Sequence, residues 1–269
     1  MNQDGHEELS AQKRSDDHRT RRRAERQSVI MTVRALSGLS GDMTLCALAS
    51  LAELTQREVN ALVSELKLPA LEGVLAIEPR SVNRIAGVGC RIDLPREHTH
   101  RSLSDIRKII AGSAMPAGAK ELSERAFVVL AEAEASAHGK KVEEIVFHEV
   151  GALDSILDIC LSCRIFAVLA ADRFACSPLP LADGVIDCAH GKLLSPAPAV
   201  LRMLTETPVR GFAGEGETVT PTALALLKAF NAEFGGWPSM IVEKTTISYG
   251  GRIFENAPNG AIWALGRSL

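Results

Sequence analysis

The sequence predicts an α/β fold of mixed α+β layers, in which helices pack on a mixed sheet beside a small β-hairpin and helix subregion. Segments rich in β-branched residues alternate with segments of helical periodicity, a pattern typical of layered architectures. Several of the helical segments begin with an N-cap residue. The chain has 269 residues, of which 46% are hydrophobic, and this is enough to build a substantial core.

In the first half of the chain, a strand is predicted over 28–36 (SVIMTVRAL). A glycine-rich turn over 37–42 leads into a helix over 43–54. A second helix begins at Thr55, because Glu58 follows three residues later and completes a capping box. The other expected elements are two strands joined by a turn over 73–94, a helix that Ser102 or Ser104 caps, and a long helix from Pro116 to Gly139.

In the second half, a helix over about 152–171 is apolar on nearly all sides and is therefore expected to be buried. Thr220 and Pro221 mark the start of a helix over 220–235, as N-cap and first helical residue. The remaining expected elements are strand and turn material at 173–181 and 183–194, a short helix at 195–206, and strands at 208–213, 239–247 and 261–265.

Charge and composition argue against several classes of protein. A net charge of -3 provides no basic field for nucleic acid, and an aromatic content of 4% argues against base stacking. No apolar run is long enough to cross a membrane, and the polar N-terminus lacks the apolar segment of a signal peptide. We therefore expect a cytoplasmic protein that binds neither nucleic acid nor membranes and keeps its 6 cysteines reduced.

Residues 1–28 differ in composition from the rest of the chain. They contain almost no large apolar side chain, and acidic and basic residues are mixed through them. Such a segment cannot bury enough apolar surface to offset the entropy of ordering. We expect a disordered charged tail over 1–28 and a folded domain over 29–269.

The stretch VFHEVGALDSILDIC, residues 146–160, places two aspartates in an otherwise apolar segment. In a helix, Asp154 and Asp158 lie one turn apart on the same face. Two unpaired buried carboxylates are costly, and a divalent cation or a basic side chain between them removes that cost. His148 and Glu149 lie just before this helix, so the four residues could form a site for nickel or zinc.

A purely structural interpretation of the same residues stays open. Asp154 in the first turn would complement the helix dipole, and Asp158 could pair with an arginine. His148 could hydrogen-bond a carbonyl group.

Two further segments are candidate anion sites. SGLSGDMT, residues 37–44, joins a strand to a helix, and free amides at a helix N-terminus favour phosphate. Ser40 and Gly41 would bind the anion, and Asp42 would either ligate a metal ion or act as a plain N-cap. Thr220 and Thr222 offer hydroxyl groups at a second helix start, where a simple N-cap at Thr220 is the alternative.

Other metal-ligating residue types are scattered along the chain. His98 and His100 point the same way in an extended segment, and His190 stands beside a glycine. Cys160 and Cys163 form a CxxC in a helix body rather than at its N-terminus, so we expect buried small residues and not a redox pair.

Several segments, taken together and in this order, resemble the N-terminal region of the LarC family of nickel-insertion proteins. The resemblance extends over about 32–250, and its most specific part is FHEVGALDSILDI. The segments are SGLSGDMTL, HRSLSDIR, VEEIVFHEVGALDSILDI, SPLPLADGVIDCAHGKLLSPAPAVL and EGETVTPTALALL.

The resemblance implies an activity and its cofactors. Members insert nickel into pyridinium-3,5-bisthiocarboxylic acid mononucleotide, which yields the nickel-pincer nucleotide, in a lyase-type cyclometallase reaction that uses CTP and Mn or Mg. A transient nickel site would consist of His148, Glu149, Asp154, His100, Asp42 and His190, with Asp154 and Asp158 as catalytic residues. Ser40, Gly41, Thr220 and Thr222 would bind the nucleotide.

The chain also departs from the family pattern. From the resemblance we expect that the family's C-terminal domain, which would bind CTP, does not follow Leu269 in this chain, and that a separate C-terminal-domain polypeptide is a candidate partner. A usual Gly-Tyr-Gly-Ala-Gly is SYGGR at 248–252, and Ala223 stands where a glycine usually follows Thr-Pro-Thr. The alternatives are a non-catalytic nickel-binding scaffold subunit and a metal-dependent phosphohydrolase, and the sequence is compatible with a homo-oligomer.

Overall fold

A computed structural model describes residues 27–94, 100–147, 150–188, 191–255 and 257–269. The predicted tail over 1–28 therefore lies, except for its last two residues, outside the described residues. Within the described part, no helix is long and apolar enough to cross a membrane.

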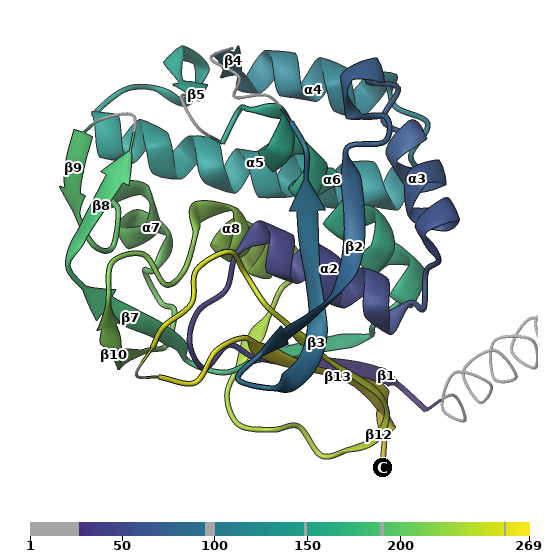
Figure 1. Cartoon of the computed structure of the whole chain (residues 1–269). Coiled ribbons are helices and arrows are strands. Elements are labelled where there is room, and N and C mark those ends of the chain that lie inside the picture. The colour runs from purple at the N-terminus through teal and green to yellow at the C-terminus, as the bar shows by residue number, and fades with distance from the viewer. Residues whose placement is uncertain (1–26, 95–99, 148–149, 189–190, 256) are drawn as a thin grey trace, which may run out of the picture.

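The largest sheet of the described residues is mixed and has seven strands; its strands at the two ends of the chain lie at the base of the fold, and its hairpin of β2 (Leu75–Val82) and β3 (Ile85–Ile92) rises beside the helices (Figure 1). In the sheet, β1 runs parallel to β6 on one side and antiparallel to β13 on the other. The strands, in spatial order, are β11 (Glu233–Phe234), β6 (Arg173–Cys176), β1 (Val29–Arg34), β13 (Ala261–Ser268), β12 (Met240–Ser248), β3 (Ile85–Ile92) and β2 (Leu75–Val82).

Three two-stranded sheets complete the β structure. They are β7 (Leu179–Asp183) with β10 (Val209–Glu215), β4 (Arg101–Ser102) with β5 (Val146–Phe147), and the hairpin of β8 (Val185–Cys188) and β9 (Gly191–Leu194).

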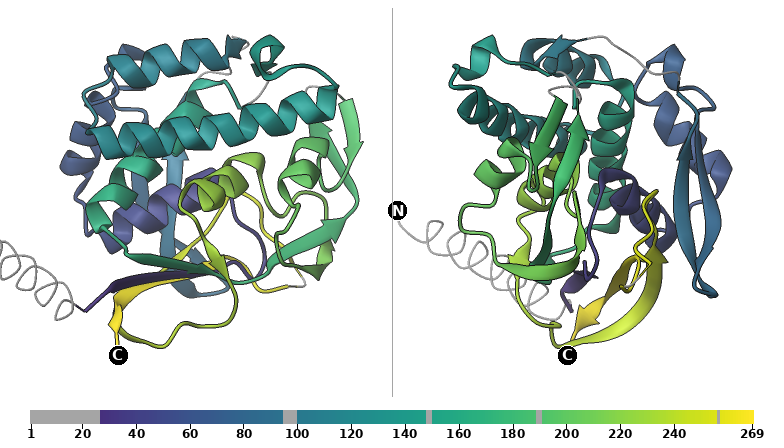
Figure 2. Two further views of the ribbon diagram at one scale, coloured as in Figure 1. Left: turned by 180° about the vertical axis from the view of Figure 1, so that it is seen from behind. Right: turned by 60° about the vertical axis from the view of Figure 1, so that its left-hand side comes forward.

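The helices gather above the β1, β13 and β12 part of the sheet, as both views of Figure 2 show. The helix α2 (Gly41–Leu51) touches β3, β12 and β13 and also packs on α6 (Leu153–Leu169), so it joins the sheet to the helical layer. The helices are α2 (Gly41–Leu51), α3 (Gln56–Ser64), α4 (Leu103–Gly112), α5 (Ala117–His138), α6 (Leu153–Leu169), α7 (Pro198–Met203) and α8 (Pro221–Ala229), with 3₁₀ turns η1 (Pro69–Leu71) and η2 (Val142–Glu144). The predicted α/β class with a mixed sheet is confirmed.

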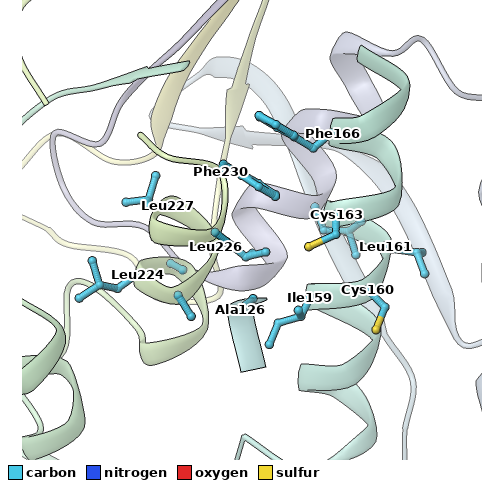
Figure 3. Close-up of a cluster of buried hydrophobic side chains, with 14 of the residues drawn as sticks. Ala126, Ile159, Cys160, Leu161, Cys163, Phe166, Leu224, Leu226, Leu227 and Phe230 are labelled. Atoms are coloured by element: carbon cyan, nitrogen blue, oxygen red, sulfur yellow. The ribbon is translucent and has the colours of Figure 1, made fainter. Parts of the chain in front are cut away.

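The core forms where α6 and α8 meet over the sheet (Figure 3). The rings of Phe166 and Phe230 stack with centroids 3.9 Å apart. Phe174 packs edge-on to both rings and stacks on Trp263. The prediction that Cys160 and Cys163 are buried is confirmed, and burial raises the pKa of the Cys160 thiol to about 12.

The capping interactions predicted from the sequence are present at several helix N-termini. Thr55 and Glu58 form the predicted capping box of α3, and Ser102 forms one with Asp105 at α4. The side chain of Thr220 accepts a hydrogen bond from the Ala223 amide, as expected for the N-cap of α8. These motifs satisfy amide groups that the helix itself leaves without partners.

Some predicted boundaries are wrong. α2 begins at Gly41 with Ser40 as N-cap, so Asp42 lies inside the first turn and is not the N-cap. The helix predicted to reach residue 235 ends at Ala229, because Asn231 has a positive φ of 53° that no α-helix tolerates, and 233–234 join the sheet as β11.

Candidate functional site

The loops before α2 and α8 pair with each other. Leu39 and Val219 form a parallel bridge, in which the Leu39 amide donates to the Thr218 carbonyl at 2.9 Å. The Thr220 amide donates in turn to the Leu39 carbonyl at 3.1 Å. The two segments predicted to bind anions, far apart in the sequence, therefore lie side by side.

Gly38 allows the two loop backbones to approach each other closely. Its φ is +139°, and a Cβ at this position would stand 2.3 Å from the Thr218 carbonyl oxygen. Only glycine combines this conformation with so close an approach of two backbones.

α6 carries Asp158 to the N-terminus of α2. A Cβ on Gly41 would stand 2.5 Å from Asp158 Oδ2 and 2.7 Å from Thr222 Cγ2, so the three residues pack directly against one another. The segments around Gly41, Asp158 and Thr222, which are far apart in the sequence, therefore meet at one point of the fold.

The carboxyl group of Asp158 is poorly satisfied. The residue keeps part of its surface accessible, but Oδ1 is buried and has no hydrogen-bond partner among the described residues. Burial, and then the charges of Asp42 and Asp154, raises the pKa of Asp158 well above its usual value. An arginine partner was the structural alternative, but among the described residues no ion pair joins Asp158 to an arginine, and Arg164, further along α6, pairs with Glu65 at 2.7 Å.

The two neighbouring aspartates differ in environment from Asp158. Asp154 is exposed in the first turn of α6, and its Oδ1 accepts a hydrogen bond from the Ser155 amide at 2.7 Å. Its expected position at the positive end of the helix dipole is therefore confirmed. Asp42 is half-buried and accepts a hydrogen bond from the Ser40 hydroxyl.

Two thiols lie behind Asp42. Cys90 Sγ is 3.3 Å from the Asp42 carbonyl oxygen. A hydrogen bond with Cys46, and then burial, raises the pKa of Cys90, and the charges of Asp158 and Asp42 act in the same direction. Cys90 thus borders a region of negative potential that favours a cation.

Two cavities adjoin these residues. The first cavity, about 280 Å³, is lined by Ser37, Gly38, Leu39, Ser40, Asp42, Met43, Glu217, Thr218, Thr220, Gly250, Gly251, Arg252, Phe254, Asn259 and Gly260.

The second cavity, about 420 Å³, is lined by Glu134, Ala137, His138, Val150, Asp154, Ser155, Ile186, Asp187, Cys188, Leu193, Ala197, Pro198, Ala199, Glu217, Pro221 and Thr222. Glu217 borders both cavities, and the start of α8 separates them.

The structure brings together most, but not all, of the predicted site residues. Ser40, Gly41, Asp42, Asp154, Asp158, Thr220 and Thr222 lie in or between the two cavities. His100 stands before β4 and lines neither cavity. His148, Glu149, His98 and His190 lie outside the described residues.

Several lining residues were not predicted from the sequence. Glu134 and His138 lie four apart on α5 and contact each other at 3.4 Å, and this spacing on a predicted helix was the available signal. Glu217 and Arg252 had no local signal. Among the residues that the structure covers, no group of three or more His, Cys, Asp or Glu side chains is close enough to hold a metal ion by itself.

Comparison with known proteins gives the family. The family model "Nickel insertion protein" matches residues 31–265. A "Putative nickel insertion protein" of Geobacter metallireducens is 39% identical over 83% of this chain and 57% of its own length. No solved structure matches the chain.

Two relatives have more specific names. Each is called "Pyridinium-3,5-bisthiocarboxylic acid mononucleotide nickel insertion protein". That of Staphylococcus saprophyticus is 38% identical over 80% of this chain and 54% of its own length, and that of Desulfitobacterium hafniense is 39% identical over 80% and 52%. The chain spans somewhat more than half the length of these relatives. On the strength of the match over 31–265, the chain belongs to the LarC family of nickel insertion proteins.

Proposed function

We propose that this chain holds nickel and the mononucleotide during nickel insertion into pyridinium-3,5-bisthiocarboxylic acid mononucleotide. The observation that carries the proposal is the buried Oδ1 of Asp158, which has no hydrogen-bond partner among the residues that the structure describes and has Asp42 and Asp154 as like-charged neighbours. Nickel is a substrate in this reaction, so its site has to bind the ion and release it again.

The carboxylates suit transient binding. A divalent cation beside Asp158 removes the repulsion from its two neighbours and supplies the partner that Oδ1 lacks. Carboxylate oxygen is a harder ligand than sulfur, so transfer from these aspartates to the thiocarboxylate sulfurs of the nucleotide is favourable for nickel.

We propose His148, Glu149 and His190 as the remaining ligands. His148 and Glu149 directly precede Val150, and His190 follows Cys188 at the second position after it. Val150 and Cys188 both line the second cavity, which also contains Asp154. Imidazole would give nickel the nitrogen ligand that the aspartates cannot provide.

The paired loops before α2 and α8 are the proposed nucleotide site. Ser40 does not cap α2 with its side chain, because its hydroxyl donates to Asp42 instead. The first amide groups of α2 are therefore without a side-chain cap at Gly41, beside Thr220 and Thr222. Such amides suit a phosphate or carboxylate oxygen.

CTP and its Mn or Mg ion belong, in this proposal, to a separate C-terminal-domain polypeptide in the cytoplasm. The proposal is tested by incubating the purified chain with the mononucleotide, nickel, CTP and manganese, with and without that polypeptide, and by measuring the nickel-containing product by mass spectrometry. Product that depends on wild-type chain and is lost with Asp158→Asn supports the proposal. Nickel binding with no product in either mixture would instead indicate the scaffold function.

A further inference from the structure

We propose that Arg252 binds the phosphate of a nucleoside monophosphate in the first cavity, from above the ring of Phe254. This inference rests on the proposed function, because it assigns one end of the mononucleotide substrate to a side chain. Arg252 lies in the stretch 248–252, which departs from the family pattern in the sequence.

Hydrogen bonds hold several described residues that follow Arg252 in the chain. The Asn259 side chain accepts a hydrogen bond from the Phe254 amide and donates one to the Phe254 carbonyl, each at 2.8 Å. Asn259 also donates to the Ala257 carbonyl, and the Ser37 hydroxyl donates to the Pro258 carbonyl. Through Ser37, the loop is fastened to the segment that leads into α2.

Arg252 is oriented by an aromatic ring and has no acidic partner in the described part of the chain. Its guanidinium carbon lies 5.1 Å from the centroid of the Phe254 ring, within cation–π range. Across the described residues, no carboxylate lies within ion-pair distance of Arg252. Gly216 makes room for it, since a Cβ there would stand 2.7 Å from Nη1. A guanidinium held on a ring and left without an anion is prepared for an external phosphate.

The charges around the first cavity indicate how a ligand would lie. Asp42 and Glu217 also line this cavity, and both repel a phosphate group. The phosphate is therefore assigned to the Arg252 side, which leaves the other part of the cavity for the ring end of the ligand. A mononucleotide has its phosphate at one end and its ring at the other, and therefore matches a cavity that has, among its described lining residues, a single cationic side chain at one side.

The size of the cavity agrees with a mononucleotide. About 280 Å³ lies close to the lower end of the roughly 300–1,000 Å³ that is typical of small-ligand sites. Such a space suits a ribose phosphate with one ring rather than a dinucleotide.

The experiment measures binding by calorimetry for wild type, Arg252→Gln and Arg252→Lys. The probes are nicotinic acid mononucleotide, which has a pyridinium ring and one phosphate, and its riboside, which lacks the phosphate. Arg267→Gln is the matched control, because Arg267 lies at the far end of β13 and pairs with Glu243 at 3.3 Å.

We expect Arg252→Gln to weaken mononucleotide binding at least about tenfold, about 1.4 kcal/mol, and Arg252→Lys to weaken it less. Riboside binding and nickel binding should stay unchanged, as should all values for Arg267→Gln. Equal mononucleotide affinity in Arg252→Gln and wild type would overturn the inference, and so would a wild type that binds no mononucleotide. The proposed function is judged separately, by nickel binding at Asp158 and by product formation.

Discussion

Asp158 and Gly41 lie in direct contact, with the Asp158 carboxylate placed where a side chain at position 41 would begin. A Cβ on Gly41 would stand 2.5 Å from Asp158 Oδ2 and 3.1 Å from its Cβ. Since Gly41 is the first residue of α2, any side chain there pushes α2 away from α6.

Gly41→Ala is therefore expected to destabilise the fold by roughly 1 to 3 kcal/mol, the usual cost of overpacking a core position. Urea unfolding followed by circular dichroism measures the change. Gly118→Ala is the control, because Gly118 lies in α5 with open space around it, and alanine there should stabilise by up to about 1 kcal/mol. Equal effects of the two substitutions would contradict the close contact.

Asp158→Asn is expected to stabilise the metal-free protein at neutral pH by roughly 1 to 3 kcal/mol, because it removes a buried charge. The pKa of Asp158 is raised in the folded state, above about 3.9 in the unfolded chain. The folded state therefore binds the proton more tightly, and wild type loses stability as pH rises through the folded pKa.

The difference in the free energy of unfolding between Asp158→Asn and wild type should accordingly be largest at pH 8 and shrink on acidification toward pH 4. Urea unfolding in EDTA across this range measures it. Asp93→Asn, at an exposed ion pair with Arg91, is the control and should change stability by no more than about 0.5 kcal/mol. A variant that is less stable than wild type at pH 8 would show that Asp158 has a favourable partner.

The cysteines should differ sharply in reactivity. Cys160 and Cys163 are both buried, and burial raises the pKa of Cys160 to about 12. Cys188, by contrast, is partly exposed and lines the second cavity. Because a thiol reagent needs an accessible thiolate, it should modify Cys188 long before Cys160 in the native protein. Mass spectrometry of peptides after brief alkylation checks the order, and early labelling of Cys160 would contradict the position of α6 in the core.

His148→Ala tests the proposed nitrogen ligand. If His148 binds nickel, its loss should weaken nickel affinity at least about tenfold, about 1.4 kcal/mol, as measured by calorimetry. His138→Ala is the comparison, since His138 lines the second cavity and contacts Glu134. Unchanged affinity in His148→Ala would remove His148 from the ligand set.

Local signals in the sequence predicted local structure well. The Thr55 and Glu58 capping box, the Thr220 N-cap and the buried character of α6 depend on residues only a few positions apart, and the structure contains all three. The boundary error at Asp42 has a long-range cause, because α2 starts two residues earlier where Gly41 packs against Asp158.

The arrangement of the site could not be predicted in the same way. The bridge between Leu39 and Val219 joins segments that no periodicity connects, and it places the two segments that were predicted to bind anions beside one cavity. Arg252 gave no signal either, because its proposed role depends on the ring of Phe254 and on the hydrogen bonds between Phe254 and Asn259. Such residues are recognisable only once tertiary contacts are known.

Nickel titration of wild type and Asp158→Asn by calorimetry tests the central claim most directly. We expect wild type to bind nickel, Asp158→Asn to bind it at least about tenfold more weakly, and Asp93→Asn to match wild type. Because Asp158→Asn should be the more stable protein, loss of binding cannot then be ascribed to unfolding. Equal nickel affinity in wild type and Asp158→Asn, or no nickel binding by wild type, would contradict the account.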